Sequence, residues 1–330
     1  MITKKFFFIL LLFLISVYSV VGQSNYTISL DFSTGFLLGT AYELIYDKSG
    51  NAEYVSELQW NMKPLWYGGI SFEFGLREPS TQVGFYGVMG LKVGLPIKTG
   101  VMEDRDWLTP TTTPGSLTFF SSHENTTKAA VILDVEPGIS LPLVNHFSMY
   151  LYLGFSYMYF KFEAKNGYTQ YGNNNKIATQ GNPYEPWNPS WPKVAISGVG
   201  VDYAQHWFIV GPGIGFMWSW KKLAANASIS VSPLVVSYTV DNHYKRNPPF
   251  QATAFLSKSF FVEPKTRFVY QFNNRYGLGL SLSYRFLAES IGDLEQVEKT
   301  ADGKVKTTLN NVAGSSYSAF SGEVFFKLSF

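Results

Sequence analysis

Apolar and polar side chains alternate with a period of two in this chain, and that pattern predicts β-strands with two unlike faces. In the last segment, GEVFFKLSF, one face carries Val324, Phe326, Leu328 and Phe330, and the other carries mostly polar groups. The segment YGLGLSLSYRF at 276–286 has the same pattern. Successive side chains of a strand point to opposite faces. Each such strand therefore needs an apolar environment on one side only.

The N-terminus indicates that the chain is exported. Lys4 and Lys5 precede an almost wholly apolar run, and Val20 and Gly22 place small residues three and one positions before Gln23. This order is typical of a secretory signal peptide, so we expect residues 1–22 to be removed after Gly22. A single transmembrane anchor is the alternative, and the short apolar core disfavours it.

Composition favours lipid as the environment of the apolar faces. Aromatic residues make up 17% of the chain, yet no second apolar run of membrane-spanning length follows the first. A soluble sandwich would turn its apolar faces inward, whereas membrane barrels expose them to lipid and place aromatic girdles at both interfaces. The aromatic C-terminal residue on an amphipathic last strand also resembles the assembly signal of outer-membrane proteins. An outer-membrane β-barrel in a diderm bacterium is the prediction.

Several chemistries are excluded by composition. The chain has no cysteine, so disulfides, thiolate metal sites and a cysteine nucleophile are ruled out. The formal charge of +2 falls to 0 when Lys4 and Lys5 leave with the signal peptide. No basic patch points to nucleic acid as a partner.

Turn signals divide residues 23–330, expected to be one domain, into ten strands. The strands are expected near 25–46, 53–76, 82–106, 126–141, 147–164, 197–219, 223–243, 251–263, 267–290 and 315–330. The turns REPST, PLVNH, WKK and EPK alternate with longer polar connections at 107–125, 165–196 and 291–314. Short turns on one rim and long loops on the other are typical of outer-membrane barrels. The prediction is an all-β fold, a ten-stranded antiparallel transmembrane β-barrel.

The length of the strands predicts that this barrel rises above the membrane. Strands of more than 20 residues, tilted by ~40°, span roughly 50 Å. The lipid-facing band of such barrels is only ~25 Å tall. The ends of the third and seventh strands are therefore expected to stand in water, outside the cell.

Two pairs of ionisable residues lie at these strand ends. GVMEDRDWL contains Asp104 and Asp106, and SYTVDNHYK contains Asp241 and His243. The i, i+2 spacing puts both members of a pair on one face of a strand. A carboxylate neighbour holds a histidine in one tautomer and raises its basicity. A water held between this histidine and an opposing carboxylate can lose a proton as it attacks a peptide carbonyl.

Counting along the strands tests whether the pairs face the lumen. In the third strand the apolar residues are odd-numbered, so the even-numbered Asp104 and Asp106 are expected to point inward. In the seventh strand the apolar set also includes odd-numbered residues, and plain counting turns Asp241 and His243 outward. One extra residue in that strand would reverse this, and Pro233 is the expected place for such a bulge.

Both motifs resemble the omptin family of outer-membrane endopeptidases. MEDRDWL is similar to the Asp-x-Asp-Trp segment of omptins, and VDNHY is similar to their Asp-x-His-Tyr segment. GTAYELIY with Glu43 and VSELQW with Trp60 extend the resemblance, which covers essentially the whole mature chain. Either short motif alone is common. Both together on the third and seventh of ten strands are specific.

The resemblance implies a role for each of these residues. Asp104 and His243 would hold the attacking water, and Asp241 would orient His243. Asp106 would lie beside the scissile carbonyl and stabilise the tetrahedral intermediate. Glu43 would line the pocket for a basic side chain just before the cut. The implied partners are peptide or protein substrates outside the cell.

Two positions depart from omptins that cut between paired basic residues. The further acids of those enzymes are replaced here by Thr239, just before the strand pair, and by Phe119, which we expect in the loop 107–125. Losing the acid at Thr239 should weaken selection for Arg or Lys before the cut, and Phe119 suggests an apolar or relaxed preference after it. We therefore expect cleavage after a basic residue with a relaxed, apolar preference following the cut. His123, in the same loop, is interpreted as a surface histidine.

Other functions remain open at this stage. The four residues of the two pairs could bind a divalent cation, but omptins use no metal, and no cofactor is expected. An adhesin or receptor barrel without turnover is the main alternative, and a narrow porin is a third. The resemblance implies dependence on outer-membrane lipid, namely lipopolysaccharide, for which Lys161 is one candidate contact. A monomer is expected.

Overall fold

The computed structural model describes residues 26–47, 54–76, 78, 80–172, 179 and 181–330. The expected signal peptide at 1–22 lies outside these residues. Within them the chain is built from β-strands, and no helix is long and apolar enough to cross a membrane. The strands are β1 (Tyr26–Tyr46), β2 (Tyr54–Leu76), β3 (Gly84–Gly94), β4 (Lys98–Asp106), β5 (Phe119–Val144), β6 (Phe147–Tyr171), β7 (Val194–Ala195), β8 (Val199–Trp220), β9 (Leu223–Ser232), β10 (Leu234–His243), β11 (Phe250–Ser257), β12 (Phe261–Gln271), β13 (Tyr276–Thr300) and β14 (Gly303–Ser329).

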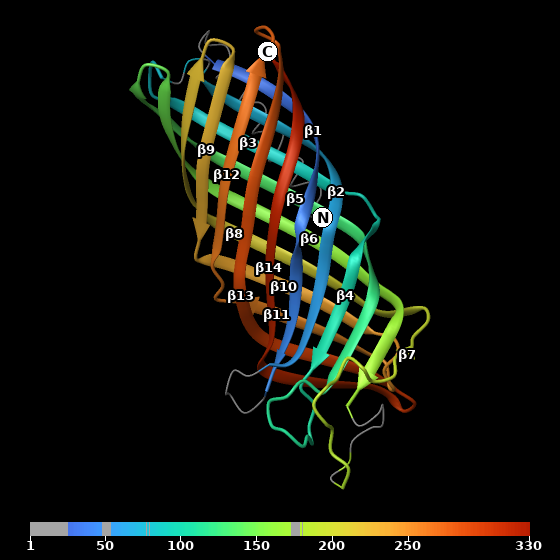
Figure 1. Cartoon of the computed structure of the whole chain (residues 1–330). Coiled ribbons are helices and arrows are strands. Elements are labelled where there is room, and N and C mark those ends of the chain that lie inside the picture. The colour runs from blue at the N-terminus through green and yellow to red at the C-terminus, as the bar shows by residue number, and fades with distance from the viewer. Residues whose placement is uncertain (1–25, 48–53, 77, 79, 173–178, 180) are drawn as a thin grey trace.

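Antiparallel pairing closes the sheet into a ring, because β14 pairs with β1. Three wall strands are interrupted, and each consists of two consecutive elements: β3 with β4, β9 with β10, and β11 with β12. With β1, β2, β5, β6, β8, β13 and β14 they make ten wall strands, while β7 pairs with β6 outside this set. The predicted ten-stranded antiparallel barrel is confirmed (Figure 1).

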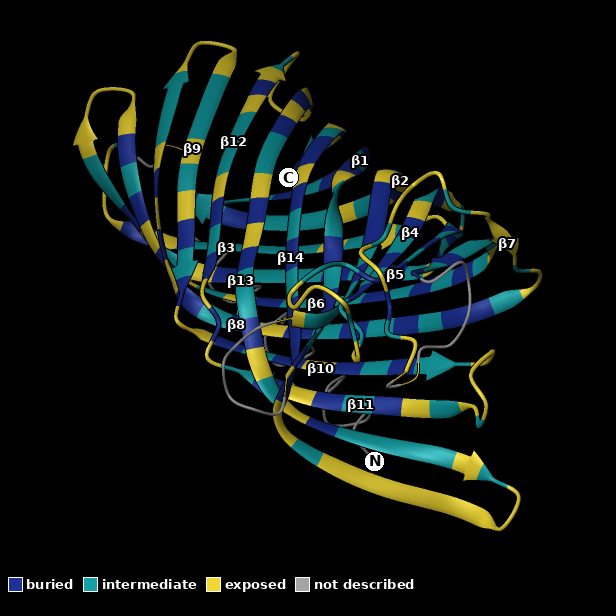
Figure 2. Ribbon diagram, turned by 60° about the horizontal axis from the view of Figure 1, so that its bottom comes forward, coloured by how far each residue is buried: buried dark blue, intermediate teal, exposed yellow. Residues whose placement is uncertain are grey.

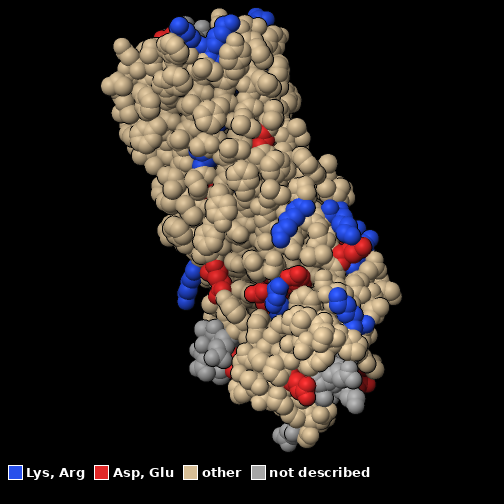
Figure 3. All heavy atoms as spheres, viewed as in Figure 1, with Lys and Arg blue, Asp and Glu red and all other residues tan. Residues whose placement is uncertain are grey.

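The two ends of the barrel differ. We call the end with the connections 107–118 and 244–249 the loop end, which lies at the bottom of Figure 1, and the opposite end the turn end. Tight turns such as 145–146 and 221–222 connect the strands at the turn end. Between the ends, the surface in Figure 3 is a broad band with few charged side chains. Large apolar side chains such as Phe32 and Trp66 are exposed there, as a lipid-facing surface requires.

Two of the predicted connections were wrong. The sequence EPK, predicted to be a turn, lies within β12, where Pro264 pairs opposite Ile229 of β9, and the turn comes at 272–275. The predicted loop 291–314 is paired for most of its length, because β13 and β14 continue as a hairpin to Thr300 and Gly303. Most of 303–311 is exposed on both faces in Figure 2. A strand surrounded by water has no apolar face, so periodicity could not detect it.

The fourth wall strand also begins earlier than predicted. β5 starts at Phe119, so Phe119 and His123, both expected in a loop, belong to the wall. The segment SSHENTT is polar on both faces, which concealed the strand. Its inward side chains nevertheless include buried Ser121 and Asn125. The lumen at this level is therefore lined by polar groups.

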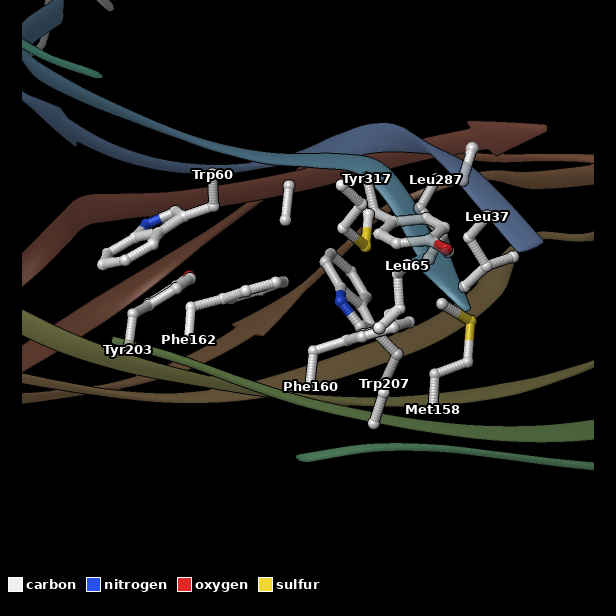
Figure 4. Close-up of a cluster of buried hydrophobic side chains, with 14 of the residues drawn as sticks. Leu37, Trp60, Leu65, Met158, Phe160, Phe162, Tyr203, Trp207, Leu287 and Tyr317 are labelled. Atoms are coloured by element: carbon white, nitrogen blue, oxygen red, sulfur yellow. The ribbon is translucent and has the colours of Figure 1, made fainter. Parts of the chain in front are cut away.

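An apolar plug fills the middle of the lumen. Trp60 stacks on Phe162 and on Tyr203, with ring centroids 5.6 and 5.7 Å apart, and Phe160 stacks on Tyr317 at 5.2 Å (Figure 4). The plug also contains Leu37, Met62, Leu65, Met158, Trp207 and Leu287. Packed interiors leave few voids larger than a water molecule. The plug therefore separates the turn-end half of the lumen from the loop-end half.

Order along β1 places the other two layers of the lumen. Inward side chains follow in the sequence Asp31, Leu37 and Glu43 from the turn end to the loop end. Asp31 belongs to a network of ion pairs, Leu37 to the apolar plug, and Glu43 to a group of carboxyl groups. The carboxyl groups therefore lie on the loop-end side of the plug.

Candidate active site

The structure brings the two predicted pairs together at the loop end of the lumen. Asp104 and Asp106 point inward from β4 and are 7% and 4% exposed. Asp241, 3% exposed, and His243 point inward from β10, which belongs to the wall strand on the other side of the barrel. Electrostatic interactions join the pairs, Asp104 with Asp241 and Asp106 with His243. One imidazole and three carboxyl groups therefore lie together at this end of the lumen, in a region that we call the cleft.

Pro233 reverses the facing of the seventh wall strand. Before it, the even-numbered Ser230 and Ser232 are buried in the lumen. Pro233 and Leu234 are both exposed, which breaks the alternation, and from Val235 onward the odd-numbered residues point inward. The extra residue required by the sequence argument is thus present at the expected place. Without it, the imidazole would face away from the lumen.

The third wall strand contains two irregularities that cancel. Residues 95–97 lie outside any strand and separate β3 from β4. After them the odd-numbered Thr99 is buried, so the facing of odd and even residues has been reversed. Gly100, with φ of +129°, then shifts the register, so that the even-numbered Met102 and Asp104 are buried. Glycine suits this left-handed backbone because it has no Cβ. Plain counting placed Asp104 correctly only because the two shifts compensate.

His243 is held firmly in the cleft. Its Nε2 hydrogen-bonds Asp241 Oδ2. Its ring stacks on Phe250, with centroids 4.4 Å apart and planes 21° apart. With Nε2–H donated to Asp241, Nδ1 is the ring nitrogen that can exchange a proton with a bound water.

The opposing carboxyl groups hold their protons tightly. Burial, followed by the charge of Asp106, raises the pKa of Asp104 well above its ordinary value. Burial, followed by the charge of Asp241, does the same for the pKa of Glu43. Burial also raises the pKa of Asp106, although the hydroxyl of Ser56 opposes the shift. Their surroundings therefore favour the protonated form of these carboxyl groups.

Three carboxyl oxygens in this group are buried without a hydrogen-bond partner among the described atoms. They are Glu43 Oε2, Asp104 Oδ1 and Asp241 Oδ1. Buried acceptors are nearly always satisfied by protein, water or ligand. Their concentration here indicates a place for donors from outside the chain. A water, a peptide N–H or a cationic side chain would each supply such donors.

The predicted pocket residues lie on two sides of the cleft. Burial and then the charge of Asp241 raise the pKa of Glu43, and Thr239, 6% exposed, is the inward residue of β10 that precedes Asp241. Phe119 lies on the other side, paired in register with Asp106. It is 3% exposed, and its ring packs against Tyr171 with centroids 4.4 Å apart. Phe119 is thus a buried wall residue, and its placement in a loop was wrong.

Two residues near the cleft were missed or misjudged from sequence. Arg246, in the connection after β10, places its Nη2 3.8 Å from Asp106 Oδ2. His123, interpreted as a surface residue, is 7% exposed and bonded at Nε2 to Ser121 Oγ (2.9 Å) and at Nδ1 to Asn166 O (2.5 Å). Alternation around His123 was hidden by polar residues. No pattern marked Arg246, because the path of a connection does not follow from periodicity.

Metal binding receives no support from the side chains in the described ranges. Among these residues, no group of three or more His, Asp or Glu side chains is arranged to hold a metal ion. Of the candidates considered from sequence, proton transfer between His243 and a water is the chemistry that this donor set fits best.

Comparison with known proteins agrees with the fold. The crystal structure of outer membrane protease OmpT from Escherichia coli superposes with a TM-score of 0.77 at 16% identity, covering 92% of this chain and 97% of that chain. A major outer membrane protein from Thermus thermophilus (10% identity, 92% and 99% covered) and the Pseudomonas putida toluene transporter TodX (9%, 93% and 90%) give TM-scores of only 0.35 and 0.31. No curated protein matches the sequence. The Omptin family model matches residues 24–330, and the chain therefore belongs to the Omptin family of the outer membrane.

Proposed function

We propose that this protein is a cell-surface endopeptidase that cleaves after basic residues by means of an activated water. The observation that carries the proposal is the group of buried, unpartnered carboxyl oxygens facing a histidine that is oriented by Asp241. Membership of the Omptin family and the likeness to OmpT support a protease of the outer membrane. The assignment of roles to single residues is part of the proposal.

The hydrolysis begins with a water held between His243 and Asp104. His243 accepts a proton from this water as its oxygen attacks the scissile carbonyl, and Asp241 stabilises the imidazolium that forms. Asp106, whose raised pKa favours the protonated form, would then donate a hydrogen bond to the developing oxyanion. The imidazolium then returns the proton to the leaving amine, and the C–N bond breaks.

Charge explains the expected preference before the cut. Glu43 lies next to Asp241 and is affected by the charge of Asp104, so this side of the cleft attracts a cation. A lysine or arginine side chain would supply donors to the unpartnered oxygens of Glu43 and Asp241. Thr239 offers only a hydroxyl where another carboxylate would strengthen this attraction. We infer a preference for basic residues that is real but weaker than in a fully acidic pocket.

The apolar plug argues against a pore. Trp60, Phe160 and Trp207 are fully buried in the middle of the lumen. Their packing leaves the substrate cleft open only toward the loop end, which we propose faces outside the cell. An adhesin or receptor remains the main alternative, because binding would not require the histidine.

Peptide profiling tests the proposal. Protein purified in detergent is incubated with a peptide library, with and without added lipopolysaccharide, and products are identified by mass spectrometry. We expect cuts after Arg or Lys with varied residues following, and none with His243→Ala. Strict cutting between two basic residues would contradict the proposed specificity. Equal turnover by the His243→Ala variant would contradict the mechanism.

A further inference from the structure

Arg246 is the cation of the cleft, and its position is unusual. It follows His243 by three residues and reaches back from the connection 244–249 to Asp106, at 3.8 Å. Its side chain is 47% exposed, whereas that of Asp106 is 5% exposed. The contact is longer than a hydrogen bond. The guanidinium is therefore half-exposed beside a buried carboxyl group, where it can meet an incoming chain.

An aromatic wall stands beside this guanidinium. Tyr171 packs on Phe119 with centroids 4.4 Å apart and stacks near Tyr184 at 6.4 Å. The charge of Arg246 acts on Tyr171, and the pKa of Arg246 is raised by Asp106, Asp104 and Tyr171 against the opposing effect of burial. Phe119, Tyr171 and Arg246 therefore surround one place next to Asp106.

The proposed water, between His243 and Asp104, would separate this place beside Asp106 from the basic-residue pocket at Glu43. Among the carboxyl groups, the charge of Asp241 acts most strongly on Glu43, whereas Phe119 is paired with Asp106 and Arg246 lies 3.8 Å from Asp106. A peptide bound across the cleft would put the residue before the cut near Glu43 and the residue after the cut near Arg246. The two sides differ in charge, since one offers carboxyl groups and the other a guanidinium on an aromatic wall.

We propose that Arg246, with the wall of Phe119 and Tyr171, forms a subsite that selects an acidic side chain directly after the cleaved bond. The inference rests on the proposed peptidase function and names its substrates as basic–acidic junctions. A carboxylate of Asp or Glu can accept hydrogen bonds from the guanidinium donors that do not face Asp106. A lysine or arginine there would meet a like charge and is disfavoured.

Matched peptides test the subsite. Three quenched fluorescent peptides carry Arg before the cut and differ only in having Glu, Gln or Lys after it. With the wild type we expect kcat/KM for Glu to exceed that for Lys roughly tenfold, and less in high salt because the site is partly exposed. Arg246→Glu should reverse the order, and Arg246→Lys should keep it in weakened form.

Lys245→Glu is the matched control. It makes the same change of charge in the same connection, and Lys245 is exposed, so the Glu-to-Lys ratio should stay as in the wild type. An unchanged ratio in Arg246→Glu, or an equal reversal in Lys245→Glu, would overturn the subsite.

Binding of the same peptides separates the subsite from the chemistry. Labelled, uncleaved peptides are titrated into His243→Ala barrels with and without Arg246→Glu. A Kd ratio that follows Arg246 supports the subsite even if the wild type cleaves nothing, in which case only the peptidase proposal falls. Cleavage after basic residues with a Kd ratio that ignores Arg246 would leave the peptidase standing and refute the subsite.

Discussion

The two polar parts of the lumen, on the turn-end side and on the loop-end side of the apolar plug, differ in how their buried charges are paired. On the turn-end side, each charged group of the network has a partner of opposite sign. Arg285 contacts Asp134 and Glu263 at 3.1 and 2.9 Å, and Lys265 contacts Glu136 at 2.8 Å. Further pairs join Lys327 to Glu73, Lys92 to Glu323, and Arg267 to Asp31 and Glu73. On the loop-end side, four acidic residues face only two cationic partners: His243 contacts Asp241, and Arg246 lies 3.8 Å from Asp106. The four acids are Glu43, Asp104, Asp106 and Asp241.

This difference separates structural from functional charge. A buried ion without a partner lowers the stability of the fold, so the charged groups on the turn-end side of the plug are paired within the chain. The cleft leaves carboxyl oxygens unpartnered, which costs stability and leaves them ready for an external donor. Removing one charged side chain on the turn-end side of the plug should therefore lower the stability of the barrel. Removing one on the loop-end side should lower its catalytic activity.

The largest expected effect compares two isosteric changes. Asp104→Asn should lower kcat/KM by roughly 10²–10⁴-fold, because the amide cannot take part in activating the water. Asp134→Asn, in the paired network, should leave the activity of folded barrels close to that of the wild type while lowering their thermal stability. Peptide cleavage per folded molecule, with folding judged by heat-modifiable migration on gels, measures both. Similar activity losses in the two variants would remove the distinction.

A second prediction concerns stability in the paired network. Arg285→Met leaves Asp134 and Glu263 buried without their cation, and should destabilise the barrel by about 3–5 kcal/mol. Adding Asp134→Asn and Glu263→Gln should restore much of this loss, because no unpaired charge then remains. Denaturant unfolding in detergent, followed by tryptophan fluorescence, measures the change. A single variant as stable as the wild type would show that these pairs are dispensable.

A third prediction uses pH in the cleft. The pKa of Glu43 is raised in the folded chain, so the folded state binds the proton more tightly than the unfolded state. Its stabilising contribution is complete below the ordinary pKa of 4.5 and is lost as pH rises toward the raised value. Each such group lowers the free energy of unfolding by at most about 1.4 kcal/mol per pH unit in that window.

Glu43→Gln removes this titration and is the variant for the third prediction. Its unfolding free energy should fall less with rising pH than that of the wild type, so the variant gains relative stability above pH 4.5. Denaturant titrations at several pH values give the slopes. Parallel slopes for the two proteins would contradict a raised pKa at this position.

The smallest expected effect restores an acid to the cleft. Thr239 points inward beside Asp241, so Thr239→Asp should sharpen selection for Arg or Lys before the cut about fivefold, equivalent to ~1 kcal/mol. Thr239→Asn, of similar size but neutral, is the control and should not change the preference. Competition between peptides with Arg and Gln before the cut gives the ratio. Equal ratios for the two variants would place the basic-residue pocket elsewhere.

Local patterns predicted much of this molecule. Alternation in segments such as 276–286 and 322–330 depends on side chains meeting lipid on one face, so the barrel and its wall strands could be predicted from sequence. The spacing of Asp104 with Asp106, and of Asp241 with His243, predicted that each pair shares a face. Strands in water, such as 303–311, carried no such pattern and were missed.

Packing between strands settled the rest. One extra residue turns every later side chain to the other face, so the inward facing of His243 depends on the break at Pro233, and that of Asp104 on two shifts that cancel near Gly100. Whether such shifts occur is decided by hydrogen bonding to neighbouring strands that are distant in sequence. The approach of Arg246 to Asp106 also depends on tertiary structure. Closure of the ring fixes the positions of the ends of β4 and β10, and these positions decide which residues the connection after β10 can contact.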